Sequence, residues 1–426
     1  MAKPGAGPML TLEQALERLL AAAARHALRE TEDVSTFDAL HRVLAEDVRS
    51  SLDVPPADNT SMDGYAMRAA DVPAAGTVLP VSQRIPAGVV GSPLVPGTAA
   101  RIFTGAQIPP GADAVVMQEH CVSREDGTVQ VDVVPQAGQW VRRQGEDIAH
   151  GSVVLTAGTR LTPQALGLAA SVGRASLQVR RRPRVAVFST GDELAMPGEP
   201  LKPGAIYNSN RYTLRGLLQA AGCDTTDFGI VPDRLDATRA ALREAAVAHD
   251  LILTSGGVSV GEEDHLRPAM QAEGHLDLWQ VAIKPGKPLA FGAVRRAGGA
   301  ADRDGSAGTG GDEALFVGLP GNPVSSFVTF LVAVAPLLRA LQGLPAAWPQ
   351  AVPMRAHFDW PRPDRRREFL RVRRDADGGL ELYPNQSSGV LTSTVWAEGL
   401  VDNPAGQSIA RGDTVSVLWL REMIGA

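Results

Sequence analysis

The sequence contains only two cysteines, Cys121 and Cys223, among its 426 residues. They do not form a CxxC pair, and two thiols cannot build the disulfide framework of a small secreted domain. We therefore expect the chain to fold in a reducing compartment, with both thiols as inert core residues.

The chain also lacks an excess of basic residues and any long apolar run. Its formal net charge is −6, so a basic face for nucleic acid is not expected, and any anion site must be local. No stretch reaches the ~18 consecutive apolar residues of a membrane span. The N-terminal stretch TLEQALERLLAAAARHALRE carries charges where a signal peptide needs an apolar core. We expect a cytoplasmic protein with no nucleic-acid partner and no membrane association.

Aromatic residues make up only 5% of the chain, yet hydrophobic residues as a whole make up 44%. A chain of this composition should fold around a sizeable core. Its length exceeds the roughly 250–300 residues at which one hydrophobic core stops growing. The sequence therefore predicts several domains.

The first half of the chain changes its pattern three times. Residues 9–50 are predicted to be helical, with Thr11 and Gln14 at capping-box spacing before an apolar stripe. Paired prolines and turn formers then break the pattern in SLDVPPADNTSMDGYAM. Short Val-rich runs from residue 78 to about residue 134 predict a small β domain. A helix is expected again at residues 162–173, which would make the β region an insertion into a helical domain.

Strand and helix patterns alternate in the next region. RVAVFST (184–190) and LILTS (251–255) are typical of buried strands, and residues 208–222 and 236–249 are typical of helices. LWQVAI, PLAFGAV, ALFVGLP and a long apolar helix from about residue 324 follow. They predict a parallel or mixed sheet covered by helices on both faces.

Two stretches interrupt or follow this sheet. Residues 295–313 are rich in Gly, Ala and Asp, and we expect a flexible surface loop without chemistry of its own. After about residue 344 a Pro-rich stretch opens a fourth region, which is predicted to be β and to run to the end of the sequence.

Four loops at the ends of the predicted strands carry the polar residues of interest. They are STGDEL (189–194), TSGGVSVGEED (254–264), IKPGKP (283–288) and GLPGNPVSS (318–326). In open α/β sheets, ligands bind beyond the carboxyl ends of the strands. We therefore expect all four loops to open on one edge of the sheet.

The chemistry of these loops suits a phosphorylated ligand with a cation. The backbone amides of SGGVS can form a concave donor site for an oxyanion, and Lys284 and Lys287 add positive charge. The acidic residues supply the hard oxygen ligands that Mg²⁺ prefers. These are Asp192, Glu193, Asp233, Glu262, Glu263 and Asp264. Each loop taken alone also fits a plain turn followed by a solvated helix start.

Seven motifs, in order along the chain, resemble the molybdopterin molybdenumtransferases, the MoeA family that includes the gephyrin E domain. They are MDGYA (62–66), TGAQIPPGADAVV (104–116), RRQGEDI (142–148), FSTGDEL (188–194), SGGVSVGEED (255–264), IKPGKPLAFG (283–292) and LPGNPVSS (319–326). The resemblance covers essentially the whole chain, and several independent motifs in one order make it specific.

The resemblance implies a multi-domain α/β plus β fold. Its parts would be a helical stalk domain at residues 9–50 and 148–180, an inserted β domain at 51–147, a doubly wound domain at 181–344 and a C-terminal β-barrel-like domain at 345–426. The doubly wound domain is of the kind shared with molybdopterin adenylyltransferases. The resemblance also implies an elongated homodimer whose active cleft joins residues of both subunits.

The implied reaction inserts molybdate into adenylylated molybdopterin, releases AMP with Mg²⁺ present and yields molybdenum cofactor. Glu193, Asp233 and Asp264 would bind the nucleotide and the cation, and Lys284 and Lys287 would hold phosphate or molybdate.

Further residues are implied around the substrate. Asp63 and Asp147 would act across the dimer cleft. The C-terminal domain would contribute molybdate contacts through Arg366 and Ser388, with Arg365, Arg367 and Ser387 as alternatives. The remaining binding residues would be Thr190, Gly191, Ser255, Gly256, Gly257, Ser259, Pro320, Gly321, Asn322 and Ser325.

No Ser/His or Cys/His arrangement stands out in the sequence, so we expect catalysis by position and charge rather than through a covalent intermediate. Two other functions remain open on sequence grounds. One is molybdopterin adenylyltransferase activity, and the other is a gephyrin-like dimeric scaffold. A molybdopterin adenylyltransferase is also a candidate partner.

Overall fold

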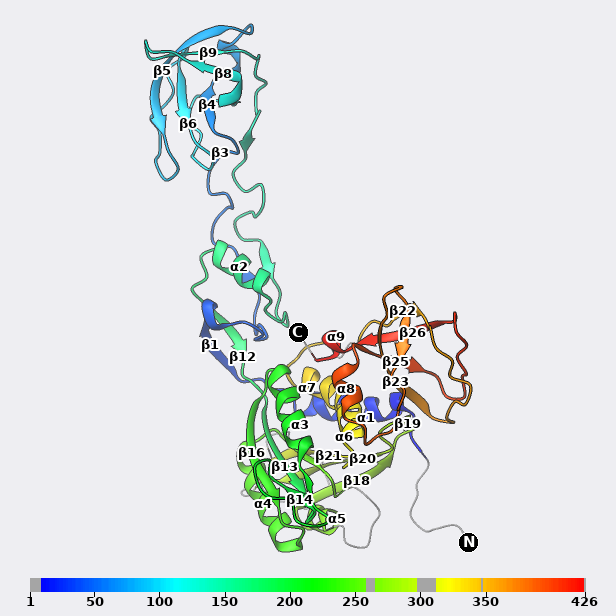
Figure 1. The fold of residues 1–426 in the computed structure, drawn as a ribbon. Coiled ribbons are helices and arrows are strands. Elements are labelled where there is room, and N and C mark those ends of the chain that lie inside the picture. Colours follow the sequence, from blue (N-terminus) through cyan, green and yellow to red (C-terminus); the bar gives the residue numbers. More distant parts are fainter. Residues whose placement is uncertain (1–8, 258–264, 297–311, 346–347, 425–426) are drawn as a thin grey trace. The chain divides into compact units, whose positions relative to one another are not determined.

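The computed structural model describes residues 9–257, 265–296, 312–345 and 348–424 (Figure 1). The chain divides into two compact units. The first comprises Met1–Glu32, His41–Val43 and Arg180–Ala426, and the second comprises Asp33–Leu40 and Leu44–Val179. The finer boundaries expected for four domains stay a prediction.

The first unit contains the doubly wound sheet that the sequence predicts. Its spatial order is β16 (Asp224–Val231), β13 (Arg184–Thr190), β17 (Leu251–Ser255), β21 (Glu313–Leu319), β20 (Pro288–Arg295) and β18 (Gly274–Gln280). The first four strands are parallel, whereas β20 runs antiparallel to both β21 and β18. Because β18 is therefore parallel to the first four, its carboxyl end lies at the same edge as theirs.

Helices cover both faces of this sheet (Figure 1). The covering helices are α1 (Leu12–Arg25), α3 (Ser209–Ala220), α4 (Leu235–Ala248), α5 (Leu266–Glu273), α6 (Pro323–Thr329) and α7 (Ala335–Leu341). Alternate strand residues face opposite sides. Val185 and Val187 pack with α1, α3 and α6–α7, while Ala186 and Phe188 pack with α4 and α5. The predicted capping box of Thr11 and Gln14 begins α1.

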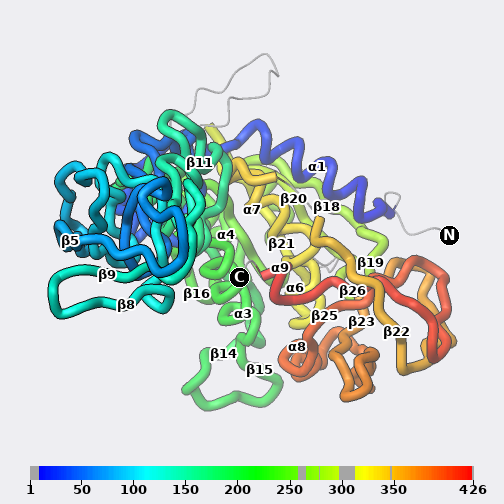
Figure 2. The backbone as a smooth tube through the Cα atoms, turned by 90° about the horizontal axis from the view of Figure 1, so that it is seen from above, coloured from blue at the N-terminus to red at the C-terminus, as the bar shows by residue number. Residues whose placement is uncertain are grey.

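Helix α6 continues through a π-helical segment, Phe330–Val334, into α7, and α7 lies beside α1 (Figure 2). Among the described residues, the stretch Pro323–Leu341 is long and apolar enough to cross a membrane by length and composition, but 83% of it is buried inside the protein. It therefore serves as a core helix.

A second sheet of the first unit forms the C-terminal part of the chain. Its order is β19 (Ile283–Lys284), β23 (Arg367–Arg374), β25 (Gly399–Asn403), β26 (Thr414–Trp419) and β22 (Val352–Arg355), and β24 (Leu380–Leu382) pairs with β23. The short helices α8 (Thr392–Trp396) and α9 (Leu420–Ile424) belong to the same part. Strand β19 comes from the loop between β18 and β20, so one loop of the doubly wound sheet is built into the C-terminal sheet.

The second unit contains the small β domain. Its main sheet has the order β7 (Ala114–Met117), β4 (Gly64–Met67), β6 (Ala99–Ile102), β5 (Thr77–Ile85), β9 (Thr128–Val131) and β8 (Cys121–Ser123). Helix α2 (Pro163–Ser171), with Thr162 as its cap, packs in a separate core with Leu44, Val48 and Ile148. The smaller elements are β2 (Val48–Arg49), β11 (Val153–Leu155), β3 (Asn59–Thr60), β10 (Val141–Arg142), η1 (Thr36–Asp38), η2 (Ala69–Asp71) and η3 (Gln118–His120).

The prediction of helix throughout residues 9–50 is wrong beyond Arg25. Thr31–Ser35 forms β1, which pairs with β12 (Ser176–Arg180), a partner far along the chain. His41 adopts a positive φ of 64°, which a helix cannot continue through. Tertiary strand pairing has overridden a pattern that locally suits a helix.

Candidate active site

A cleft of about 670 Å³ lies at the carboxyl edge of the doubly wound sheet. Its walls come from all four predicted loops, which confirms that these loops open on one edge. Of the predicted site residues, it is lined by Thr190, Gly191, Glu193, Asp233, Ser255, Gly256, Gly257, Pro320, Gly321, Asn322 and Ser325. The ribbon of β14 (Leu194–Ala195) and β15 (Ile206–Tyr207) adds Leu194, Ile206 and Tyr207.

Glycines allow two of these loops to approach each other closely. Gly256 has a φ of 93°, and a Cβ atom there would lie 2.7 Å from the carbonyl oxygen of Thr190. Any side chain would therefore push apart the loops that follow β13 and β17. The backbone N–H of Gly256 donates to the carbonyl oxygen of Leu319 at 3.1 Å, which ties the loop after β17 to the loop after β21.

The start of α6 forms another wall of the cleft. Asn322 is the N-cap residue and Pro323 occupies the first turn, where a missing N–H costs nothing. Ser325, in the same turn, is buried and lines the cleft. The side-chain amide of Asn210 at the start of α3 donates to the carbonyl oxygen of Gly321 at 2.8 Å. Two helix N-termini with their positive field thus meet at the cleft, which suits an anion.

Two predicted metal-binding carboxylates, Glu193 and Asp233, line the same cleft. No group of three His, Cys, Asp or Glu side chains that could hold a metal occurs within the part of the chain that the structure describes. The predicted residues Ser259 and Asp264, together with Glu262, Glu263 and most of the 295–313 loop, lie outside the described residues.

A second cavity of about 600 Å³ is formed by Met9, Lys287, Pro363, Asp364, Arg365 and Arg366. It is linked to the cleft through the chain itself, because Lys287 lines this cavity and its neighbour Pro288 lines the cleft. Two predicted anion contacts, Lys287 and Arg366, therefore share one cavity. Lys284, three residues before Lys287 in the chain, is the last residue of β19.

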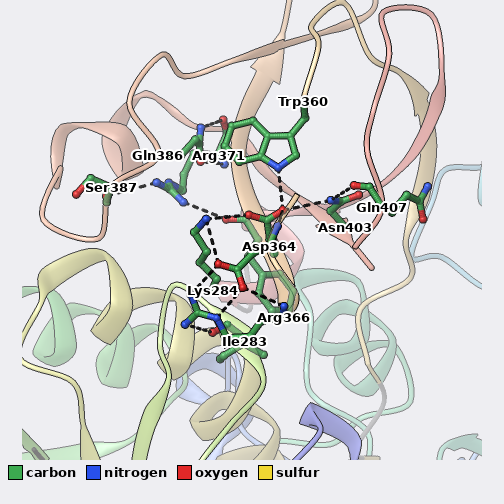
Figure 3. A network of polar contacts seen from close by, with 12 residues as sticks. Ile283, Lys284, Trp360, Asp364, Arg366, Arg371, Gln386, Ser387, Asn403 and Gln407 are labelled. Carbon is green, nitrogen blue, oxygen red and sulfur yellow. Dashed lines mark hydrogen bonds and ion pairs between the residues drawn. The ribbon is translucent and has the colours of Figure 1, made fainter. Parts of the chain in front are cut away.

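Arg366 is held by an acidic neighbour. Its guanidinium donates to both carboxylate oxygens of Asp364 at 2.9 Å, and to the carbonyl oxygen of Ile283 at 3.4 Å (Figure 3). This pairing with Arg366 keeps the pKa of Asp364 well below its ordinary value. Asp364 therefore fixes the position of the Arg366 guanidinium, and the role of Arg366 as a molybdate contact stays a prediction.

Arg371 is a candidate that the sequence reasoning missed. It lies in the middle of β23, is 1% exposed, and forms no ion pair among the described residues. Its guanidinium donates only to neutral oxygens, namely Ser393 Oγ at 3.3 Å, Phe369 O at 3.1 Å and Ser387 O at 3.5 Å. Burial lowers its pKa to about 10. The available signal was a charge inside the apolar pattern EFLRV.

The segment around Ser388 connects Arg371 to the cleft. Gln386 exchanges hydrogen bonds with the backbone of Arg371, the carbonyl oxygen of Ser388 accepts from the N–H of Val324 at 3.0 Å, and Gly389 lines the cleft. The structure thus fixes this segment between β23 and the start of α6. The predicted role of the Ser388 side chain stays a prediction.

Asp63 and Asp147 belong to the second unit. Oδ1 of Asp63 accepts from the backbone N–H and the hydroxyl of Thr104, each at 2.7 Å, and these hydrogen bonds lower the pKa of Asp63. Asp147 is exposed. Their proposed action across a dimer cleft stays a prediction.

The two thiols lie in different settings. Cys223 is buried, whereas Cys121 is partly exposed, and burial raises the pKa of Cys121 to about 11. A thiol with so high a pKa is a poor nucleophile at neutral pH, as expected for an inert residue.

Family models match three successive parts of the chain. Residues 10–173 match the MoeA N-terminal region (domain I and II), residues 186–340 match a probable molybdopterin binding domain, and residues 353–420 match the MoeA C-terminal region (domain IV). The first match covers α1 and most of the second unit, the second covers most of the doubly wound sheet, and the third covers most of the C-terminal sheet.

Relatives and solved structures agree with these matches. The chain is 41% identical to the molybdopterin molybdenumtransferase of Haemophilus influenzae over 335 residues, which are 79% of this chain and 78% of that protein. It is 36% identical to the molybdopterin molybdenumtransferase of a Nostoc species over 404 residues, covering 92% and 89% of the two proteins. The crystal structure of the molybdopterin biosynthesis MoeA protein of Pyrococcus horikoshii is similar with a TM-score of 0.78 at 28% identity, over 97% of this chain and 100% of that one.

Proposed function

The chain belongs to the MoeA family of molybdopterin molybdenumtransferases, and from this premise we propose how its described residues bring molybdate and molybdopterin together. The activity is a transferase reaction of molybdenum cofactor biosynthesis. The observation that carries the proposal is the convergence of four loops of the doubly wound sheet in one cleft with both donors and carboxylates.

The cleft binds molybdopterin in its adenylylated form. A phosphoanhydride carries negative charge that the amides of Gly256 and Gly257 and the N-termini of α3 and α6 can hold. The exposed side chains of Ile206 and Tyr207 on the same cleft offer a surface for a flat ring. Volume supports this assignment, because about 670 Å³ lies within the range of small-molecule sites.

Molybdate binds beside this ligand, between the 284–288 loop and the C-terminal sheet. Lys287 lines the second cavity, and Arg371 contributes a buried positive charge behind the segment that carries Ser388. An oxyanion is the natural counter-charge for a guanidinium that forms no ion pair among the described residues.

Mg²⁺ fits the carboxylates of this cleft. Glu193 and Asp233 are hard oxygen ligands, and Mg²⁺ is commonly held by one or two carboxylates together with substrate phosphates. These two residues, with Asp264, would hold the ion. When bound, Mg²⁺ supplies positive charge that offsets the repulsion between the phosphoanhydride and molybdate.

Catalysis then rests on position and charge. The two dithiolene sulfurs of molybdopterin replace an oxygen ligand of molybdenum, which leaves as water with the two thiol protons. Water cleaves the phosphoanhydride, so that AMP leaves and the phosphate stays on molybdopterin. The protein has to seat two anions side by side, which its helix termini, Lys287 and Arg371 make possible.

The family membership also supports a homodimer in a reducing, cytoplasmic setting. In that dimer, Asp63 and Asp147 of one subunit would complete the cleft of the other. A molybdopterin adenylyltransferase would supply the substrate.

Purified protein incubated with adenylylated molybdopterin, molybdate and Mg²⁺ should release AMP and form cofactor that reactivates an apo-molybdoenzyme. Omitting molybdate, or chelating Mg²⁺ with EDTA, should suppress both products. A parallel incubation with ATP and free molybdopterin tests adenylyltransferase activity. Adenylylated product in that arm, without AMP release in the first arm, would overturn the proposal.

A further inference from the structure

Lys284 and Glu368 are directly paired residues of adjacent parallel strands. Lys284 ends β19 and lies opposite Glu368 near the start of β23. Side chains at paired positions point to the same face of a sheet. Accordingly, Nζ of Lys284 lies 3.1 Å from Oε1 of Glu368, and this pair is the only ion pair of Glu368 among the described residues.

The two oxygens of Glu368 have different partners. Oε2 accepts from the indole N–H of Trp360 at 2.8 Å and from the backbone N–H of Asp364 at 3.1 Å, with the amide of Asn403 at 3.5 Å (Figure 3). Oε1 accepts from Lys284. One oxygen thus anchors the carboxylate in the C-terminal sheet, and the other is directed at the lysine.

Without Lys284, the buried carboxylate of Glu368 would have no opposite charge and would destabilise the fold. Glu368 is fully buried, whereas the side chain of Lys284 is 38% exposed. A buried carboxylate needs an opposite charge. The neighbouring carboxylate, Asp364, is already paired with Arg366 and approaches Lys284 only at 3.5 Å. Glu368 is therefore the group that fixes where the ammonium of Lys284 lies.

The position of Lys284 matters because its strand leads directly into the loop between the two cavities. Lys287 and Pro288 follow within four residues and line the second cavity and the cleft. The stem of a lysine is flexible, so an ammonium without a fixed partner loses rotamer freedom when it binds an anion.

We propose that Glu368 is a positioning residue, which holds the ammonium of Lys284 in place for the oxyanion substrate. This inference rests on the proposed function of the same site and on the sequence-based expectation that Lys284 holds phosphate or molybdate. It assigns to Glu368 no contact with the substrate; Glu368 acts through Lys284.

The test measures the affinity for molybdate, and its KM, in the full-length protein carrying Glu368→Gln. The amide can keep the hydrogen bonds from Trp360 and Asp364 but loses the charge that holds Lys284. We expect the dissociation constant of molybdate and its KM to rise about tenfold, while kcat changes little. The reason is that Lys284, no longer held by a carboxylate, loses rotamer freedom when molybdate binds. Removing a negative charge near an anion would by itself tighten binding. Unchanged or tighter binding in the variant therefore overturns the proposal.

A double-mutant cycle separates positioning from a general structural role. Lys284→Met should weaken molybdate binding, and adding Glu368→Gln to it should cause no further loss. Equal losses with and without Lys284 would overturn the proposal. Should Glu368→Gln fail to fold, Glu368→Asp, which keeps the charge but withdraws it from Lys284, should show a smaller loss with the same dependence on Lys284.

Glu381→Gln is a matched control, because it removes a carboxylate paired with Arg373 in the same sheet that lines neither cavity. It should leave molybdate binding unchanged. Equilibrium binding of molybdate is measured apart from AMP release, so a wild-type protein that binds molybdate but releases no AMP contradicts the proposed function and leaves the Glu368 test intact.

Discussion

The buried guanidinium of Arg371 is held by neutral oxygens alone, an arrangement that costs folding free energy. Its pKa is lowered to about 10 by burial, so the folded state holds the proton less tightly than the unfolded state. The resulting destabilisation is fully present at neutral pH and is relieved only as the pH rises above about 10. The anionic substrate proposed above would supply the opposite charge that Arg371 lacks among the described residues.

Arg371→Met should therefore leave the free energy of unfolding unchanged or raise it by up to about 2 kcal/mol, while molybdate binding is lost. Urea unfolding and calorimetric titration with molybdate measure the two effects. Arg181→Met is the matched control. Arg181 pairs with Asp250 and Glu30 and lines neither cavity, so its loss should cost about 3 kcal/mol and spare molybdate binding. A clear loss of stability in Arg371→Met with binding retained would mean that Arg371 is structural.

Asp63 offers a residue-scale test of acid stability. Hydrogen bonds from Thr104 lower its pKa, so its contribution to stability is fully present above the ordinary value of 3.8 and is lost as the pH falls through the lowered folded value. Asp63→Asn keeps an acceptor for Thr104 but cannot titrate. The urea midpoint of the wild type should exceed that of the variant at pH 7, and the two should converge at the acid end. A difference in urea midpoint between the two proteins that is the same at every pH would contradict this account.

At the scale of elements, the sequence could predict the strands and their loops because alternation and parallel pairing leave few choices. RVAVFST and LILTS form β13 and β17 with the predicted bounds, and every loop expected at the sheet edge contributes to the cleft. The tie between Asn210 and Gly321 could not be predicted, since it joins residues 111 positions apart through one hydrogen bond. The role of Arg371 was missed for a similar reason, because its surroundings come from Phe369, Ser387 and Ser393 together.

Asn210→Ala should loosen the turn that precedes α6. The hydrogen bond to Gly321 fixes the peptide between Gly321 and Asn322, and its loss should cost about 1 kcal/mol. Hydrogen exchange should become faster at the amides of Gly321, Asn322 and residues 324–326, and KM for the adenylylated substrate should rise more than kcat falls. Gln219→Ala, near the end of the same helix, removes an exposed side-chain amide that lines neither cavity and should change neither quantity. Equal effects of the two variants would show that the hydrogen bond from Asn210 to Gly321 does not hold the turn before α6 in place.

At the scale of the whole molecule, the motifs that carry the resemblance are spread over both units, and the composite site that the resemblance implies stays a prediction. The doubly wound sheet and its cleft belong to the first unit, whereas MDGYA and RRQGEDI, with Asp63 and Asp147, belong to the second. Composition and periodicity could indicate the doubly wound sheet and the small β domain, because each has its own core, but not that α1 packs against the doubly wound sheet. They could not determine whether a second subunit completes the cleft, since that depends on surfaces and not on local patterns.

Subunit mixing tests the proposed homodimer directly. Asp147→Asn alters the second unit and Glu193→Gln alters the cleft of the first, so each variant alone should release little AMP. In a mixed dimer with composite sites, one site carries both substitutions and the other carries neither. Random mixing should then restore about a quarter of wild-type activity, because half of the dimers are mixed and each has one intact site. If each cleft were completed within a single chain, every site in the mixture would carry one substitution, and mixing would restore nothing.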